Sequence, residues 1–244
     1  MIMRSYPANF SKKQLFYLSI PVFFSNLAIP LVGLVDTGLM GNMGNTIYLS
    51  ATSIATSVMT MIVWSFGFLR MGTVGIVAQL FGKGDYREIV RTLLRNFLLA
   101  IFFSTIIILF KPFIINAIKY FFSISMETQN LIDTYLSVRV FSVPAEFIIY
   151  ILVGFYLGIQ KTKISSLLII TLSIFNILFS SFFVLSMNLD ILGVALGTLI
   201  SSYITTILFV LFTYNFIVKK FKIFPQFNKL IVYSKLLKLF NINF

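Results

Sequence analysis

The sequence contains neither cysteine nor histidine among its 244 residues. Without cysteine the chain forms no disulfide and no thiolate-ligated metal centre. Without histidine it lacks the commonest catalytic base and metal ligand, and the side chain that titrates near neutral pH. Any proton-coupled step must therefore use carboxylates, and we do not expect an enzyme.

Charged residues are also scarce, at 11% of the chain against about 25% in soluble domains. Hydrophobic residues make up 59%, and the mean hydropathy is +0.98. No soluble core needs so much apolar surface. We therefore predict an all-α membrane protein that crosses the bilayer several times.

Acidic residues are few, with 7 Asp and Glu against 19 Lys and Arg and a net charge of +12. Such a charge can indicate nucleic-acid binding, but its distribution argues otherwise. The basic residues precede the first apolar run or follow the second, fourth and sixth: Arg4, Lys12, Lys13, Lys83, Arg87, Arg91, Arg95, Lys161, Lys163, Lys219, Lys220, Lys222, Lys229, Lys235 and Lys238. The opposite loops hold only Lys111 and Lys119. This positive-inside pattern predicts a multi-pass inner (plasma) membrane protein in contact with lipid, both termini cytoplasmic, and no nucleic acid.

Six apolar runs separated by polar breaks predict a six-helix bundle over residues 1–218. The expected spans are 15–41, 47–81, 93–118, 128–159, 163–187 and 191–218. The second run is too long for one perpendicular span, so it must tilt or project from the membrane. The tail 219–244 mixes basic and apolar residues and is interpreted as an amphipathic helix on the inner leaflet.

The first run carries the most informative side chain. It contains two prolines, Pro21 and Pro30, and a single acid, Asp36. An acid inside a membrane helix costs at least a few kcal/mol and usually serves a function. Pro30 frees a backbone carbonyl about a turn from that acid and favours a kink. A kinked helix with one acid indicates a transporter, with Pro30 as its hinge.

Three other oxygen-bearing side chains are expected at the depth of Asp36, and a fourth lies one turn deeper. Counting residues from the span ends at about 1.5 Å each places Tyr135, Ser180 and Thr198 roughly 8–12 Å below the outer surface, in one layer with Asp36. Asn176 lies one turn deeper than Ser180, on the same face. A carboxylate, an amide oxygen and hydroxyls are hard ligands that suit Na⁺. The sequence therefore predicts a site for Na⁺, with Asp36, Asn176 and Thr198 as possible ligands, or for H⁺ on the same acid.

Two further patterns concern packing. Gly154 with Gly158, and Gly193 with Gly197, are spaced to let helices approach closely. Arg139 and Glu146 share a helix face but stand about two turns apart, so a direct ion pair is not expected without help from other helices.

Asp85, with Glu88 three residues later, is expected to cap a helix.

The segments IPVFFSNLAIPLVGLVDTGLMGNMGNTIYLSA (20–51), LRMGTVGIVAQLFGKGD (69–85), YLSVRVFSVPAEF (135–147) and YLGIQKTK (156–163) resemble the multidrug and toxic compound extrusion (MATE) transporters. The VDT at Asp36 and the LRM at Arg70 are most similar to the DinF-like branch. The resemblance runs in order over about residues 10–218. It implies a fold of two six-helix lobes that exports cationic amphiphilic compounds in exchange for Na⁺ or H⁺.

The resemblance also implies a cation site in the first lobe at Asp36, Tyr135, Asn176, Ser180 and Thr198. Ser180 departs from the family pattern, which has an acid at that position, so cation affinity should fall or coupling should rest on Asp36 alone. The sequence matches one lobe, and its tail resembles the inter-lobe connector.

Several alternatives stay open. The missing lobe is separately encoded, or a second copy of the chain takes its place, or the chain is a truncated, transport-inactive remnant. A flippase for lipid-linked precursors is a further candidate, although its cavity should hold more cations than Arg70 and Arg139 supply.

Overall fold

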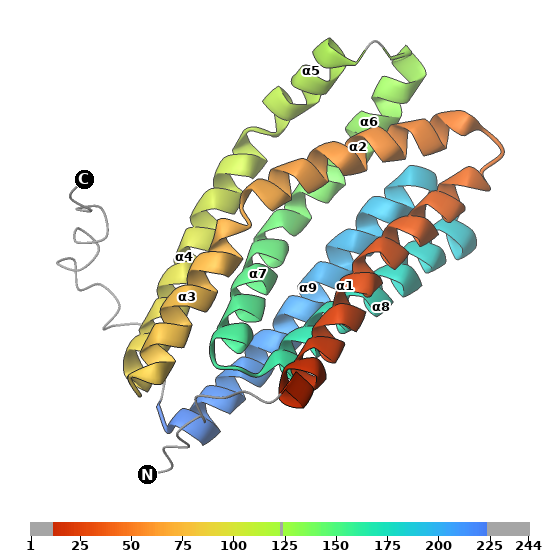
Figure 1. The fold of residues 1–244 in the computed structure, drawn as a ribbon. Coiled ribbons are helices and arrows are strands. Elements are labelled where there is room, and N and C mark those ends of the chain that lie inside the picture. Colours follow the sequence, from red (N-terminus) through yellow and green to blue (C-terminus); the bar gives the residue numbers. More distant parts are fainter. Residues whose placement is uncertain (1–11, 123, 224–244) are drawn as a thin grey trace.

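The computed structural model describes residues 12–122 and 124–223, and the expected tail helix lies almost entirely outside them. The described chain is helical (Figure 1). Its α-helices are α1 (Lys12–Gly41), α2 (Thr46–Ser65), α3 (Phe68–Gly82), α4 (Tyr86–Leu109), α5 (Lys111–Phe121), α6 (Met126–Arg139), α7 (Val143–Gly158), α8 (Thr162–Ser181) and α9 (Asp190–Phe216). A 3₁₀-helix, η1 (Val140–Ser142), joins α6 to α7. Two π-helices, η2 (Phe182–Ser186) and η3 (Ile217–Phe221), extend α8 and α9.

Five described stretches are long and apolar enough to cross a membrane: Thr46–Gly82, Tyr86–Leu109, Met126–Gly158, Thr162–Ser186 and Asp190–Phe221. A shorter apolar stretch, Leu31–Gly41, belongs to α1, which runs as one helix through position 30. Within the described residues, these lengths and compositions define a helical bundle with five stretches able to cross a membrane and one shorter apolar helix.

Two expected runs are divided in the structure. The 47–81 run breaks between α2 and α3 at Phe66, and the peptide N–H of Gly67 returns to the Trp64 carbonyl at 2.8 Å. The 93–118 run differs more: α4 starts at Tyr86, ends at Leu109, and gives way to α5. Pro112 explains this second break, because proline is favoured in the first turn of a helix and disfavoured in its interior.

The start of α4 confirms the expected cap. The Asp85 carboxylate accepts a hydrogen bond from the Glu88 peptide N–H at 3.1 Å. The Glu88 side chain does not complete a reciprocal box, because it pairs with Arg91 at 3.1 Å and with Arg95 at 2.8 Å.

The helices form two groups that are visible in Figure 1. In one group α3 packs against α4 and α7, and in the other α8 packs against α1 and α9. Contacts of α6 and α7 with α9 join the groups. The α3–α4 turn, the α7–α8 turn and η3 all lie at the lower end in Figure 1. The basic residues of these segments therefore gather at one end of the bundle.

The first glycine pair produces the close approach that its spacing predicts. A Cβ added at Gly154 would lie 2.7 Å from the Arg70 carbonyl oxygen. One added at Gly158 would lie 2.8 Å from the Val77 side chain. Both positions therefore hold α7 directly against α3.

Candidate functional site

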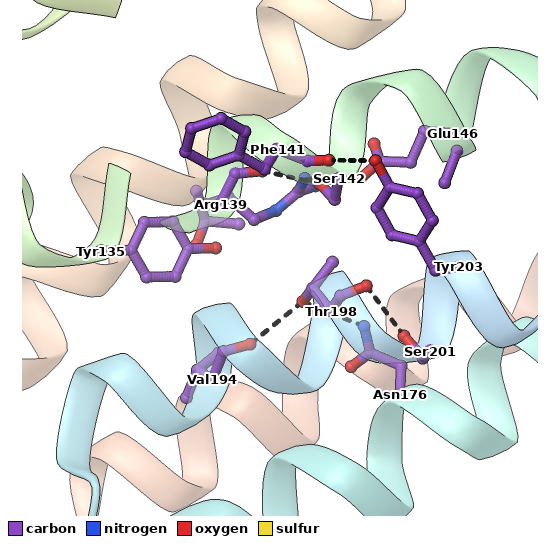
Figure 2. Close-up of polar contacts among 12 residues, drawn as sticks. Tyr135, Arg139, Phe141, Ser142, Glu146, Asn176, Val194, Thr198, Ser201 and Tyr203 are labelled. Carbon is purple, nitrogen blue, oxygen red and sulfur yellow. Dashed lines mark hydrogen bonds and ion pairs between the residues drawn. The ribbon is translucent and has the colours of Figure 1, made fainter. Parts of the chain in front are cut away.

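Three of the predicted site residues form a hydrogen-bonded cluster between α8 and α9. The Asn176 amide nitrogen donates to Thr198 Oγ1 at 3.1 Å, and Ser180 Oγ donates to Asn176 Oδ1 at 3.3 Å. Thr198 in turn donates to the Val194 carbonyl at 3.2 Å. Asn176 and Ser180 are buried and Thr198 is half-buried. We call these three residues the polar layer (Figure 2 shows Asn176 and Thr198).

The second glycine pair brings the two helices of this layer together. A Cβ added at Gly197 would lie 2.6 Å from the Ser180 nitrogen and 2.7 Å from its Cα. One added at Gly193 would lie 2.9 Å from the Val184 side chain. The backbone of α9 thus rests on α8 at Ser180, leaving little room for a larger side chain there.

Asp36 reaches the layer from α1, which packs along α8. Its carboxyl group is a near neighbour of the Ser180 hydroxyl. Its Oδ1 atom is buried and, within the described residues, has no hydrogen-bond partner. A carboxylate oxygen shielded from water and left unpaired is costly, and a bound proton or cation removes that cost.

Tyr135 is placed differently from the prediction. Its side chain is buried, and its hydroxyl lies 3.2 Å from Thr56 Oγ1 of α2. No described hydrogen bond joins it to Asn176 or Thr198. Tyr135 therefore lies at the edge of the polar layer, on the side of α6, and its hydroxyl bonds to Thr56 rather than to a residue of the layer.

Arg139 and Glu146 form a direct ion pair, and the expectation of no direct contact was wrong. Arg139 Nη1 lies 2.5 Å from Glu146 Oε1. Ser142 Oγ donates to the same oxygen at 2.7 Å and also accepts from Arg139 Nη1. The 3₁₀ turn between α6 and α7 explains the contact. It changes the helical register just before Pro144, so the spacing of a continuous α-helix does not apply.

Hydroxyl groups from α9 bind carbonyl oxygens near this break. Tyr203 donates to the Phe141 carbonyl at 3.0 Å, and Thr206 to the Ala145 carbonyl at 3.1 Å. Backbone polar groups inside a membrane need internal partners, and these two side chains supply them. The packing of α9 against the junction of α6 and α7 therefore stabilises this break.

The structure therefore brings Asp36, Asn176, Ser180 and Thr198 together and sets Tyr135 at their border. Sequence reasoning missed Ser142 and Thr56 as members of the surrounding network. The signal for Ser142 was Pro144, which has no peptide N–H to donate to the carbonyl four residues earlier and so disrupts the helix in the preceding turn. Figure 2 shows Arg139, Ser142 and Glu146 on one side of the site and the α8–α9 residues on the other.

The donor set limits the chemistry. Within the described residues, no three acidic side chains gather as metal ligands, and the sequence has no cysteine or histidine. Transition metals prefer such nitrogen and sulfur ligands. One unpaired carboxylate oxygen among amide and hydroxyl oxygens fits a proton or a hard monovalent cation.

Comparison with known proteins shows the family to which the chain belongs. The model of the MatE family matches residues 21–182. DNA damage-inducible protein F of Escherichia coli K12 is 30% identical over 198 residues, which are 81% of this chain and 43% of that protein. Multidrug export protein MepA of Staphylococcus saprophyticus is 22% identical over 200 residues, 82% of this chain and 44% of MepA. The chain thus spans less than half the length of these relatives.

Solved structures show the same architecture. An outward-facing multidrug resistance MATE family transporter of the MOP superfamily superposes with a TM-score of 0.79 at 19% identity. A MOP superfamily transporter from Pyrococcus furiosus gives the same values. Each comparison covers 91% of this chain and 48% of the other.

The fold and its composition define a multi-pass α-helical membrane protein with a carboxyl group, that of Asp36, buried between its helices. The chain belongs to the MatE family, whose members are membrane transporters and not enzymes, and its sequence is similar to DinF.

Proposed function

We propose that this chain is one lobe of a cation-coupled antiporter that exports small, cationic amphiphilic compounds. Asp36 is the residue that carries the coupling Na⁺ or H⁺. The observation that supports this most directly is the buried, unpaired Oδ1 of Asp36 beside the polar layer. The relatives named multidrug export protein support the substrate class.

Cation binding at Asp36 would act on the conformation of α1. The neutralised carboxyl group favours one bend of the helix at Pro30, and the ionised group favours the other. A ligand shifts such an equilibrium only by its difference in affinity for the two states. Because α1 packs against α8 beside Ser180, its bending changes the surroundings of Asp36 and supplies that difference.

Substituting Asp36→Asn in the native gene tests this function. Ethidium transport is measured in everted membrane vesicles, driven by a Na⁺ gradient or by a proton gradient. The gradient that drives transport by the wild-type protein identifies the coupling ion. The Asp36→Asn variant should show no transport with either gradient. Asp190→Asn is the matched control, because Asp190 accepts from Tyr48 at 3.4 Å and an asparagine oxygen can do the same. Normal export by Asp36→Asn would refute the mechanism.

A second six-helix lobe is proposed as the partner of this one. The exposed face of α2 supports this, because it presents a groove of about 660 Å³ lined by Thr56, Ser57, Thr60, Met61, Trp64 and Ser65. Met61 and Trp64 are 74% and 71% exposed. Serine and threonine are enriched where membrane helices pack together, so this face suits a second lobe.

Cross-linking identifies that partner. Since the chain has no cysteine, Met61→Cys introduces a single reactive thiol on this face. A bifunctional thiol reagent in native membranes should give a homodimer if a second copy is the partner. A heteromeric adduct would identify a separately encoded lobe. Protein that stays uncross-linked, with a thiol still reactive toward maleimide, would argue against a partner at α2.

The orientation follows from the basic end of the bundle. The α3–α4 and α7–α8 turns and η3 share that end. Together with the adjoining starts of α4 and α8 and with Lys222, they carry most of the described lysines and arginines, so we propose that this end faces the cytoplasm of a bacterial inner membrane. The thiol of a Lys83→Cys variant should then react with impermeant maleimide in everted vesicles and be protected in intact cells.

Ser180 favours one alternative, a lobe that no longer transports. A hydroxyl at this position brings one negative charge fewer than an acid, which weakens attraction for a cation. Such a lobe would give no efflux in wild type and no difference in Asp36→Asn.

A further inference from the structure

Two arginines of α4 share one carboxylate at the basic end of the bundle. Arg91 Nη1 lies 3.1 Å from Glu88 Oε2, and Arg95 Nη1 lies 2.8 Å from Glu88 Oε1. Each carboxylate oxygen therefore holds one guanidinium, and the two arginines, four residues apart, stand side by side on the helix. Two positive charges against one negative charge leave this group with a net charge of +1. It has no part in the function described so far.

The pairing with Glu88 leaves hydrogen-bond donors unused. An arginine has five N–H donors, and the described hydrogen bonds of both arginines to Glu88 use Nη1. The Nε atom of Arg95 is buried and has no hydrogen-bond partner within the described residues. The Arg91 side chain is 45% exposed, so a ligand can reach it from outside. Phosphate oxygens are the acceptors that paired guanidiniums bind best.

A second segment adds positive charge beside the start of α4. The ring of Tyr86 stacks on that of Phe221 in η3, with centroids 4.7 Å apart. This contact brings three exposed lysines to the start of α4: Lys219, Lys220 and Lys222. Residues 83–95 and 219–222 together hold seven lysines and arginines against two acids. An anion approaching this junction therefore meets an excess of positive charge.

The exposed face of α4 changes from basic to apolar within one turn. Leu98 follows Arg95 by three residues and Phe102 follows Leu98 by four, so they continue the face of the two arginines. Leu98 is 55% exposed and Phe102 is 58% exposed. A cationic group at the end of a membrane span, followed by an exposed apolar strip, matches a phospholipid, whose phosphate lies at the surface and whose acyl chains run inward.

The direction of the Arg95 side chain agrees with this match. Arg95 lies nine residues beyond Tyr86, where α4 begins, or about 14 Å into the helix at 1.5 Å per residue. Its guanidinium turns back toward the helix start to reach Glu88. Long basic side chains in membrane helices reach the headgroup region in this way.

We propose that Arg91 and Arg95 form a binding site for an anionic phospholipid of the cytoplasmic leaflet. The lipid phosphate accepts hydrogen bonds from the two guanidiniums that Glu88 holds side by side, and one acyl chain lies along Leu98 and Phe102. The lysines of η3 add attraction for the headgroup. The choice of leaflet rests on the proposed orientation, whereas the site itself does not involve Asp36.

The test is lipid binding by the purified protein in detergent. The protein is titrated with dioleoyl phosphatidylglycerol or with dioleoyl phosphatidylcholine, and its melting temperature is followed, because a ligand of the folded state raises it with occupancy. The anionic lipid should bind about tenfold or more tightly, since each cation near an anionic surface contributes about fivefold. Equal binding of both lipids would overturn the proposal. Stabilisation by soluble glycerol phosphate equal to that by phosphatidylglycerol would assign the site to a soluble anion and overturn the lipid.

A pair of double variants separates this site from the general charge of the basic end. Arg91→Gln with Arg95→Gln should abolish the preference for phosphatidylglycerol. Lys161→Gln with Lys163→Gln is the matched control, because it removes the same charge at the same end of the bundle, beside the α7–α8 turn, and should keep the preference. Equal losses in both double variants would show that net charge attracts the lipid and would overturn the site.

Single variants keep the test decisive if the Arg91 and Arg95 double variant does not fold. Arg91→Gln changes an exposed side chain and should weaken phosphatidylglycerol binding by about fivefold. Arg91→Lys keeps the charge but loses the planar arrangement of donors, so its affinity should lie between those of wild type and Arg91→Gln. Unchanged binding in Arg91→Gln would refute the site. None of these measurements involves transport or Asp36, so their failure is distinct from a failure of the proposed function.

Discussion

Substituting Gly197→Ala tests whether the close packing of α8 and α9 holds the polar layer together. The added Cβ would overlap Ser180 Oγ and would lie 2.6 Å from the Ser180 nitrogen and 2.7 Å from its Cα. The hydroxyl can rotate away, but the backbone atoms cannot. Since ordinary van der Waals separation begins near 3.4 Å, the two helices must move apart locally by roughly 0.7 Å to relieve the overlap with the Ser180 Cα.

The expected cost is that of overpacking, about 1–3 kcal/mol. For a protein of this size each kcal/mol lowers the melting temperature by about 2–4 °C. Thermal unfolding in detergent, followed by circular dichroism, measures the shift. The separation should also stretch the 3.1 Å bond between Asn176 and Thr198 and weaken cation binding at Asp36.

Gly72→Ala is the matched control, because no atom lies within 4 Å of its added Cβ and it also stands inside a helix. Its melting temperature should stay the same or rise, since alanine favours helix more than glycine does. If the melting temperature of Gly197→Ala equalled those of wild type and Gly72→Ala, the close packing of α8 and α9 would not be what stabilises the polar layer.

Two further changes have expected costs. Asp85→Ala removes the cap on the Glu88 peptide N–H and should cost about 0.5–2 kcal/mol, whereas Asp85→Asn should cost little; thermal unfolding compares them. Tyr156→Phe removes the buried hydroxyl 2.7 Å from Thr213 and should cost about 1 kcal/mol, a result that an unchanged unfolding midpoint in denaturant would contradict.

The membrane fold could be predicted because apolar run length directly reflects bilayer thickness. The cap at Asp85 and the tight glycine packing could also be predicted, since both depend on local chemistry. Counting from the helix ends predicts Ser180 and Thr198 in one layer, and helical spacing predicts Asn176 on the face of Ser180; the structure joins these three by hydrogen bonds. Tyr135, expected in the same layer, is hydrogen-bonded to Thr56 instead.

The ion pair of Arg139 and Glu146 could not be predicted, because it depends on a single turn of 3₁₀-helix between them. Spacing rules assume one continuous helix, and hydropathy gives no sign of a change in register. The partner of Tyr135 was hidden for a related reason. Thr56 is 79 residues away in the chain, so only the packing of α2 on α6 reveals the hydrogen bond.

The break between α6 and α7 gives the buried pair a direction. Arg139 lies in the last turn of α6 and Glu146 in the first turn of α7. A helix carries partial negative charge at its C-terminus and partial positive charge at its N-terminus, so each side chain also complements its own helix end. Exchanging the two residues would keep the ion pair but oppose both helix dipoles. The polarity of the backbone, and not the pair alone, therefore determines which charge stands on which side of this break.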